Sequence, residues 1–268
     1  MARSESELDD WLAFAETLAD EAAIVVRRYF RAALTVEHKP AAGRLEQPVT
    51  QADREAEETI RQLIRKRYPD HGVLGEEHGL ERPDAPLRWV IDPIDGTRAF
   101  IAGLPLFGTL IALSEGDRPI LGVIDQPVLR ERFIGSERGA FLNRQPIRSR
   151  RCQRLADAVY ALTDPGMMRT PAQRAAYTQL RRQARVTQFG GNCYAYGMLA
   201  LGQIDLITEG DLKPWDVHAL IPIIEAAGGV ITGWDGGSAA AGGLIVACGD
   251  PVLHAELLPL LQGAAANP

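Results

Sequence analysis

The sequence has few cysteines and no long hydrophobic run. Its three cysteines, Cys152, Cys193 and Cys248, are far apart and show no Cys-x-x-Cys spacing. This pattern supports neither a disulfide framework nor a thiolate zinc site. No apolar stretch approaches the roughly 18 residues of a membrane span, and the polar N-terminus is not followed by the apolar segment of a signal peptide. We therefore expect a cytoplasmic protein that does not bind membranes.

The chain also has no excess of positive charge. Its 29 Lys and Arg residues stand against 35 Asp and Glu residues, which gives a net charge of −6. This balance would repel a polyphosphate backbone and argues against general binding of nucleic acid. Nucleic-acid binding through the arginine-rich stretches 148–154 and 181–185 is a hypothesis that the net charge and the lack of a recognition motif disfavour, and residues 148–154 are better explained as a solvated linker.

Residue patterns predict a first domain over residues 1–149. Apolar residues at helical spacing predict an amphipathic helix over 8–29, and a second helix begins near Thr50 and ends near Pro69. Short segments rich in β-formers and separated by turn residues predict a mostly antiparallel sheet. These segments are residues 73–74, 87–91, 106–113, 120–124, 132–134 and 140–142. The first domain is therefore expected to be α+β.

Strands and helices alternate in the second predicted domain, residues 150–268. The expected strands are residues 159–162, 186–189, 204–208, a short one near Val230, and 244–247. The expected helices are residues 171–183, 193–201, 214–227 and 252–261. This alternation predicts an α/β domain.

The strongest local signal is the segment WVIDPIDGT, residues 89–97. An apolar strand leads directly into Asp92 and Asp95, and the proline between them fixes φ and has no N–H. Gly96 permits a sharp turn, and Thr97 can cap a following helix. Converging carboxylates of this kind suit Mg²⁺, although a strand-ending turn with capping aspartates is the simpler explanation when the motif is taken alone.

Three further acidic residues lie where a predicted element begins or ends. Glu76 follows a short strand, Asp53 lies in the first turn of the second helix, and Asp216 opens a helix after a proline. Each has a structural explanation when taken singly. Asp53 fits the third position of a capping box, and Asp216 is an acid that the helix dipole favours.

Taken together, GEE at 75–77, DPIDGT at 92–97 and WDV at 215–217 resemble, in order and spacing, the inositol monophosphatase superfamily. The resemblance spans almost the whole chain. It implies a layered αβαβα sandwich of the inositol monophosphatase and fructose-bisphosphatase type, in agreement with the α+β and α/β halves. It also implies a homodimer and hydrolysis of a small phosphate monoester by metal-activated water, with two to three Mg²⁺ ions.

The resemblance assigns roles to individual residues. The implied metal ligands are Glu76, Asp92, the main-chain carbonyl of Ile94, Asp95 and Asp216. Thr97 and Asp53 correspond to the catalytic pair that orients the attacking water, and Glu76 is catalytic as well as a ligand. The N–H groups of Gly96 and Thr97 correspond to a phosphate cradle at a helix start. Lys39 corresponds to a flexible lysine near the metals.

Three further stretches, residues 100–113, 190–197 and 212–216, are most similar to the histidinol-phosphate phosphatases within this superfamily. The substrate-binding residues implied by the resemblance are Asp95, Gly96, Thr97, Asn192, Glu209 and Asp216. Asn192 stands where we expect an aspartate in this subfamily, and it lacks the charge that would face the substrate ammonium.

The sequence therefore predicts a Mg²⁺-dependent phosphatase that hydrolyses L-histidinol phosphate in histidine biosynthesis. Inositol monophosphates, fructose bisphosphate and a nucleoside bisphosphate are alternative substrates. A non-catalytic, metal-binding regulatory protein on the same fold is a third hypothesis. Retention of every implied metal ligand, together with Thr97 and Asp53, argues against it.

Overall fold

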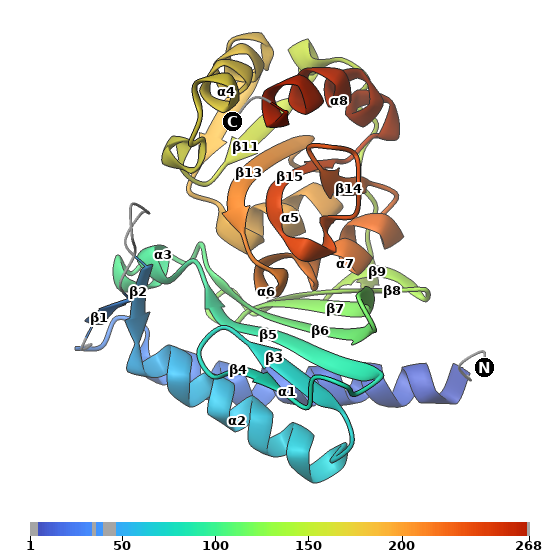
Figure 1. Ribbon diagram of the computed structural model, residues 1–268. Coiled ribbons are helices and arrows are strands. Elements are labelled where there is room, and N and C mark those ends of the chain that lie inside the picture. The colour runs from blue at the N-terminus through green and yellow to red at the C-terminus, as the bar shows by residue number, and fades with distance from the viewer. Residues whose placement is uncertain (1–4, 34–35, 40–46, 267–268) are drawn as a thin grey trace.

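The computed structural model describes residues 5–33, 36–39 and 47–266, and they form five stacked layers of helices and sheets (Figure 1). Helices α1 (Glu5–Tyr29) and α2 (Gln51–Arg67) cover the outer face of the first sheet. Helices α5 (Asn192–Ala200), α6 (Pro214–Val217) and α7 (Leu220–Ala226) lie between the two sheets. Helices α4 (Pro171–Gln183) and α8 (Pro251–Ala265) cover the far face of the second sheet. The predicted αβαβα sandwich is confirmed.

The first sheet has eight strands in the order β10-β9-β8-β7-β6-β5-β3-β4. Its strands are β3 (Gly72–Gly75), β4 (Gly79–Glu81), β5 (Leu87–Asp95), β6 (Gly108–Glu115), β7 (Arg118–Gln126), β8 (Glu131–Ser136), β9 (Gly139–Leu142) and β10 (Gln145–Pro146). All neighbours are antiparallel except β3 and β5. The sheet is therefore mostly antiparallel, as predicted. Strands β1 (Val36–Lys39) and β2 (Gln47–Thr50) form a separate hairpin in a stretch for which no strand was predicted.

The second sheet has five strands in the order β12-β11-β13-β15-β14. Its strands are β11 (Val159–Leu162), β12 (Val186–Phe189), β13 (Leu206–Leu212), β14 (Val230–Gly233) and β15 (Gly243–Cys248). Strand β11 is parallel to β12 and β13, whereas β15 is antiparallel to both of its neighbours. The described chain also contains α3 (Thr97–Ile101) and the 3-10 turns η1 (Leu155–Asp157), η2 (Pro165–Met167) and η3 (Ala239–Ala241).

Two predicted helix details differ from the structure. The single helix expected over 214–227 is divided into α6 and α7. Pro222 explains the division, because it has no N–H to donate to the carbonyl of His218, and the helix restarts with Pro222 in its first turn. Thr97 is the first residue of α3 rather than its cap. The cap is Gly96, whose φ is +90°.

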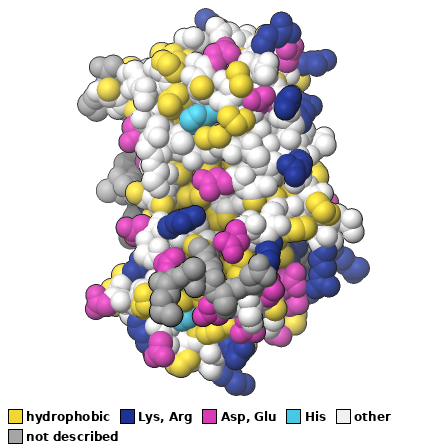
Figure 2. All heavy atoms as spheres, turned by 90° about the vertical axis from the view of Figure 1, so that its right-hand side faces the viewer, with side chains coloured by type: hydrophobic (Ala, Val, Ile, Leu, Met, Phe, Trp, Pro, Cys, Tyr) yellow, Lys and Arg dark blue, Asp and Glu magenta, His cyan; other side chains and the backbone are white. Residues whose placement is uncertain are grey.

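Apolar residues fill each interface between layers. The face of α1 that carries Leu8 and Leu18 packs against Ile111 and Val123 of the first sheet. Helices α5 and α7 belong to the second half of the sequence but pack on strands of the first sheet. The two predicted domains, residues 1–149 and 150–268, are therefore in close contact, and the boundary between them stays a prediction. No helix within the described residues has both the length and the apolar character needed to span a bilayer. On the face in Figure 2, basic and acidic side chains are interspersed.

Candidate active site

The candidate site begins at an irregularity in β5. In a regular strand, residues three apart point to opposite faces of the sheet, so Asp92 and Asp95 would face apart. The register between β5 and β6 shifts between these two residues, where Asp92 pairs with Leu110 but Asp95 pairs with Gly108. Such a shift re-aims side chains. It allows both carboxylates to turn toward the same place.

Asp216 completes a cluster of three carboxylates. One carboxylate oxygen from each of Asp92, Asp95 and Asp216 lies within 4.8 Å of the other two. Each carboxylate is oriented by a backbone N–H group. Ile94 N donates to Asp92 at 3.0 Å, Cys193 N donates to Asp95 at 2.6 Å, and Lys213 N donates to Asp216 at 2.6 Å. The donors come from β5, α5 and the start of α6, so both halves of the chain build the cluster.

The electrostatics of the cluster favour a bound cation. Burial raises the pKa of Asp92 well above its ordinary value, and repulsion from Glu76, Asp95 and Asp216 raises it further. Burial and the charge of Asp95 likewise raise the pKa of Asp216. The pKa of Asp95 is raised by burial, although the hydrogen bond from Cys193 opposes the shift. A hard divalent cation such as Mg²⁺ would neutralise these oxygen ligands, so the donor set fits the predicted metal.

The carboxylates line a cavity of about 190 Å³ between the two sheets. Glu76, Ile94, Gly96, Thr97 and Asn192 also line it, so the structure brings these predicted residues together. The positive φ of Gly96 favours glycine, and a Cβ at this position would lie 2.9 Å from the Asn192 side chain. Glycine therefore permits the close approach of α5 to this turn.

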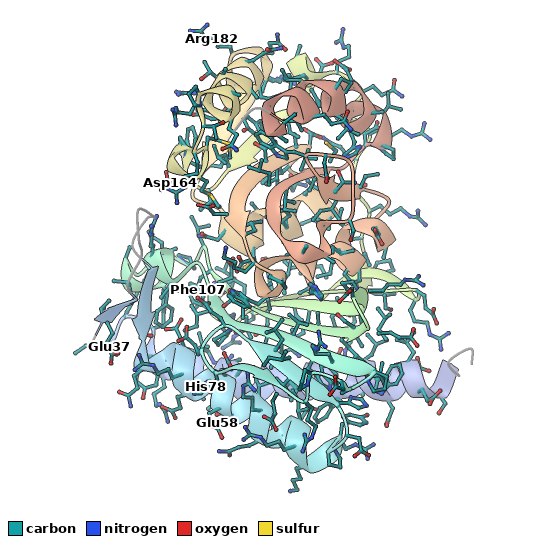
Figure 3. All side chains as sticks on the ribbon, viewed as in Figure 1. Glu37, Glu58, His78, Phe107, Asp164 and Arg182 are labelled. Atoms are coloured by element: carbon teal, nitrogen blue, oxygen red, sulfur yellow. The ribbon has the colours of Figure 1, made fainter. Side chains whose placement is uncertain are left out.

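Two ion pairs that the sequence did not predict lie at the same cavity. Arg98 pairs with Asp164 at 3.2 Å, and Arg169 pairs with Asp211 at 2.6 Å. Figure 3 shows Asp164 on the side of the molecule where α3 faces the second sheet. No local sequence pattern predicts these ion pairs, because the partners are 66 and 42 residues apart in the sequence.

The predicted water-orienting pair is not joined by a hydrogen bond within the described part of the chain. Thr97 Oγ1 donates to the carbonyl of Ile94 at 3.2 Å. Asp53 closes a capping box and accepts the backbone N–H of Thr50 at 2.8 Å as well as the Thr50 hydroxyl. Burial raises the pKa of Asp53 to about 6. The pairing stays a prediction, and the side chain of Lys39 lies outside the described residues.

Glu209 and Asn192 both contact Thr163, a cavity-lining residue that the sequence did not single out. The Glu209 carboxylate is only 3% exposed and accepts both the N–H and the hydroxyl hydrogen of Thr163. Burial raises its pKa to about 7. The backbone N–H of Asn192 donates to Thr163 Oγ1 at 3.0 Å. Glu209 therefore lies beneath the cavity lining, and direct contact with substrate stays a prediction.

The five-layer fold and the acidic cluster at the end of β5 define the class of αβαβα phosphatases. The sequence profile of the Inositol monophosphatase family matches residues 7–265, and the chain belongs to this family. Membership of this family, which depends on Mg²⁺, supports the prediction that the protein is a phosphoric monoester hydrolase.

Individual relatives carry different substrate names. The chain is 42% identical over 271 residues to the chloroplastic bifunctional phosphatase IMPL2 of Arabidopsis thaliana, with 97% of this chain and 77% of that protein covered. It is 37% identical to a histidinol-phosphatase of Streptomyces coelicolor, with 95% and 97% covered. A solved inositol monophosphatase from Zymomonas mobilis superposes with a TM-score of 0.85 at 41% identity, with 97% and 100% covered.

Proposed function

We propose that the protein hydrolyses L-histidinol phosphate to L-histidinol and phosphate, with Mg²⁺ held by the acidic cluster. The observation that carries the proposal is the convergence of Asp92, Asp95 and Asp216, whose pKa values are raised chiefly by burial, with charge repulsion adding to the shift at Asp92 and Asp216. Glu76 and the carbonyl of Ile94 are the further proposed ligands. Bound Mg²⁺ lowers the pKa of a water molecule and neutralises phosphate charge.

The chain's own residues supply orientation. Backbone N–H groups fix each carboxylate, so little reorganisation is needed when substrate arrives. Gly96 and Thr97 line the cavity at the start of α3 and are the proposed phosphate contacts. Asp53, with a pKa of about 6, is the proposed proton acceptor that acts with Thr97 on the attacking water.

The choice of histidinol phosphate rests on the similarity to histidinol-phosphatases, together with the carboxylates around the cavity. Its leaving group carries an ammonium and an imidazole, which carboxylates recognise by charge-assisted hydrogen bonds. Asp164 and Asp211 line the cavity, where each is paired with an arginine that a substrate cation would have to replace, and Glu209 lies beneath it. The similarity to a protein named histidinol-phosphatase supports the same substrate.

Inositol monophosphate is the second candidate substrate. The similarity to the Zymomonas mobilis inositol monophosphatase favours it, and so does the neutral Asn192 where the histidinol-phosphatase pattern predicts an aspartate. An inositol ring needs hydroxyl partners rather than carboxylates, and Oδ1 of Asn192 can accept from a hydroxyl, whereas Nδ2 already donates to two backbone carbonyls.

The test is phosphate release with Mg²⁺ from histidinol phosphate, inositol phosphate, fructose bisphosphate and adenosine bisphosphate. Asp95→Asn is the inactive control, because the amide oxygen of asparagine can take the place of Asp95 Oδ2 as acceptor of the Cys193 N–H, while one ligand charge is lost. We expect kcat/KM for histidinol phosphate to exceed the others by at least about tenfold. A higher kcat/KM for another ester would overturn the substrate assignment. If no phosphate is released from any of the four esters, the hypothesis of a non-catalytic, metal-binding protein is favoured instead. The predicted homodimer is tested separately by sedimentation equilibrium.

A further inference from the structure

A buried ion pair lies directly beneath the turn that carries Glu76. Glu57 and Arg61 are one turn apart on α2, and their side chains are 0% and 2% exposed. Arg61 Nε donates to Glu57 Oε1 at 2.7 Å. Burial of two charges costs several kcal/mol per ion unless further hydrogen bonds satisfy their remaining polar atoms. The groups that make these further hydrogen bonds are therefore the groups that the ion pair holds in place.

Three of those groups belong to the backbone of the turn between β3 and β4. Glu57 Oε2 accepts the N–H of Glu77 at 2.8 Å, and Oε1 accepts the N–H of His78 at 3.1 Å. Arg61 Nη2 donates to the carbonyl of Gly79. The pair therefore binds three consecutive residues of the turn. Two side chains also contact the pair, since His78 Nδ1 lies 3.3 Å from Glu57 Oε1 and Arg61 Nη1 lies 3.5 Å from Glu81 Oε2.

Gly75 brings the Glu57 carboxylate against the residue just before the metal ligand. A Cβ at Gly75 would lie 2.1 Å from Glu57 Oε1, so the carboxylate occupies the space that any side chain would need. On the other side, Glu76 N donates to the carbonyl of Ile91 on β5 at 3.3 Å. Glu76 is thus fixed between β5 and the turn that Glu57 holds.

We propose that Glu57 is a positioning residue for the metal ligand Glu76: its buried carboxylate, held by Arg61, fixes the turn and thereby sets the affinity for the divalent cation. The inference rests on the proposed function, because it needs Glu76 to be a ligand. Groups that orient metal ligands contribute 10–100-fold to metal affinity. A purely structural ion pair would instead change stability and leave the affinity of the folded protein unchanged.

The test measures Mn²⁺ binding to metal-free protein by the loss of the free-ion electron paramagnetic resonance signal. Glu57→Gln keeps the shape of the side chain, but its amide NH₂ must face either the N–H of Glu77 or the two N–H donors of Arg61 and His78. We expect the Kd for Mn²⁺ to rise 10–100-fold. The Mg²⁺ concentration for half-maximal hydrolysis should rise in parallel, with kcat at saturating Mg²⁺ within about twofold of the wild type.

Glu58→Gln is the matched control, because Glu58 is the next residue of α2 and pairs with Arg65 at the surface. Its Kd should equal that of the wild type. If Glu57→Gln does not fold, Arg61→Lys is measured instead. It keeps a cation beside Glu57 but removes the guanidinium contacts to the turn, so we expect the Kd for Mn²⁺ to rise at least about threefold.

The outcomes separate the two proposals. Wild-type protein that binds no Mn²⁺ would overturn the proposed metal site, and the role of Glu57 with it. If the wild type binds Mn²⁺ and folded Glu57→Gln binds it with the same Kd, the positioning role alone is overturned. The same conclusion holds for an unchanged Kd in Arg61→Lys when Glu57→Gln does not fold. A raised Kd in the deciding variant with an unchanged Kd in Glu58→Gln supports it.

Discussion

Asn192 joins the two halves of the site through its side-chain amide. Its backbone has a φ of +44°, a left-handed conformation that asparagine tolerates better than most residues. The amide Nδ2 donates to the carbonyl of Leu106 at 2.7 Å and to the carbonyl of Gly190 at 3.3 Å. An aspartate in this conformation would place a carboxylate oxygen opposite two carbonyl oxygens. The departure from the expected aspartate therefore has a structural reason.

We expect Asn192→Asp to destabilise the metal-free protein by about 1–3 kcal/mol, because two donated hydrogen bonds become repulsive contacts. Thermal unfolding at neutral pH measures the loss. Asn192→Gly is the comparison, since glycine accepts the positive φ and loses the hydrogen bonds without adding repulsion. The melting temperatures should fall in the order wild type, Asn192→Gly, Asn192→Asp. An aspartate variant as stable as the wild type would contradict the geometry.

The resemblance of the motifs to a known family predicted the acidic cluster, but not several other residues that line the cavity. Asp92, Asp95 and Asp216 stand out in the sequence because each lies close to a proline and to the end of an element. Thr163 gives no such signal, because its position depends on Glu209 and Asn192 from other parts of the chain. The same holds for Arg98 and Asp164, whose contact needs the two sheets to be assembled first.

Helix α7 lies unusually close to the first sheet. Gly122 of β7 and Gly135 of β8 are directly paired across the two strands. A Cβ at Gly122 would lie 2.0 Å from the carbonyl oxygen of Ala219, and one at Gly135 would lie 2.2 Å from the Cα of Ile223. The paired glycines therefore form a flat surface against which the helix backbone packs.

Gly135→Ala should destabilise the protein by about 1–3 kcal/mol or more, because the methyl group meets backbone that cannot move without displacing α7. Denaturant unfolding gives the free energy. Gly263→Ala is the matched control, since Gly263 lies inside α8 and a Cβ added there would meet nothing within 4 Å. It should stabilise by about 0.5–1 kcal/mol, as alanine favours helix. Equal effects of the two substitutions would show that α7 does not pack as described.

Elements with strong periodicity and end signals were predicted most accurately. Helix α4 spans the predicted residues 171–183, with Thr170 and Gln173 forming a capping box and Pro171 in the first turn. The hairpin of β1 and β2 was missed because its sequence is polar and carries prolines. Strand order also escaped prediction. It depends on pairing between distant segments, such as β3 with β5, which local patterns do not encode.

At the scale of the whole molecule, the acidic cluster couples stability to pH. The pKa values of Asp92, Asp95 and Asp216 are raised in the folded protein. Between the ordinary carboxyl pKa values near 4 and the raised values, the folded state binds more protons than the unfolded state. The contribution of these groups to the stability of metal-free protein is therefore full at low pH and is lost as the pH rises through the raised values.

Mg²⁺ should reverse this loss, because it binds the deprotonated carboxylates. At about pH 8, Mg²⁺ at about 100 times its Kd should stabilise the protein by about 2.7 kcal/mol and raise Tm by about 5–10 °C. At about pH 5.5 the same concentration should raise Tm less, since protons compete with the metal. Differential scanning calorimetry with and without Mg²⁺ measures both shifts, and Asp95→Asn should show neither. An equal Tm shift at the two pH values would mean that Mg²⁺ binds somewhere other than the buried cluster.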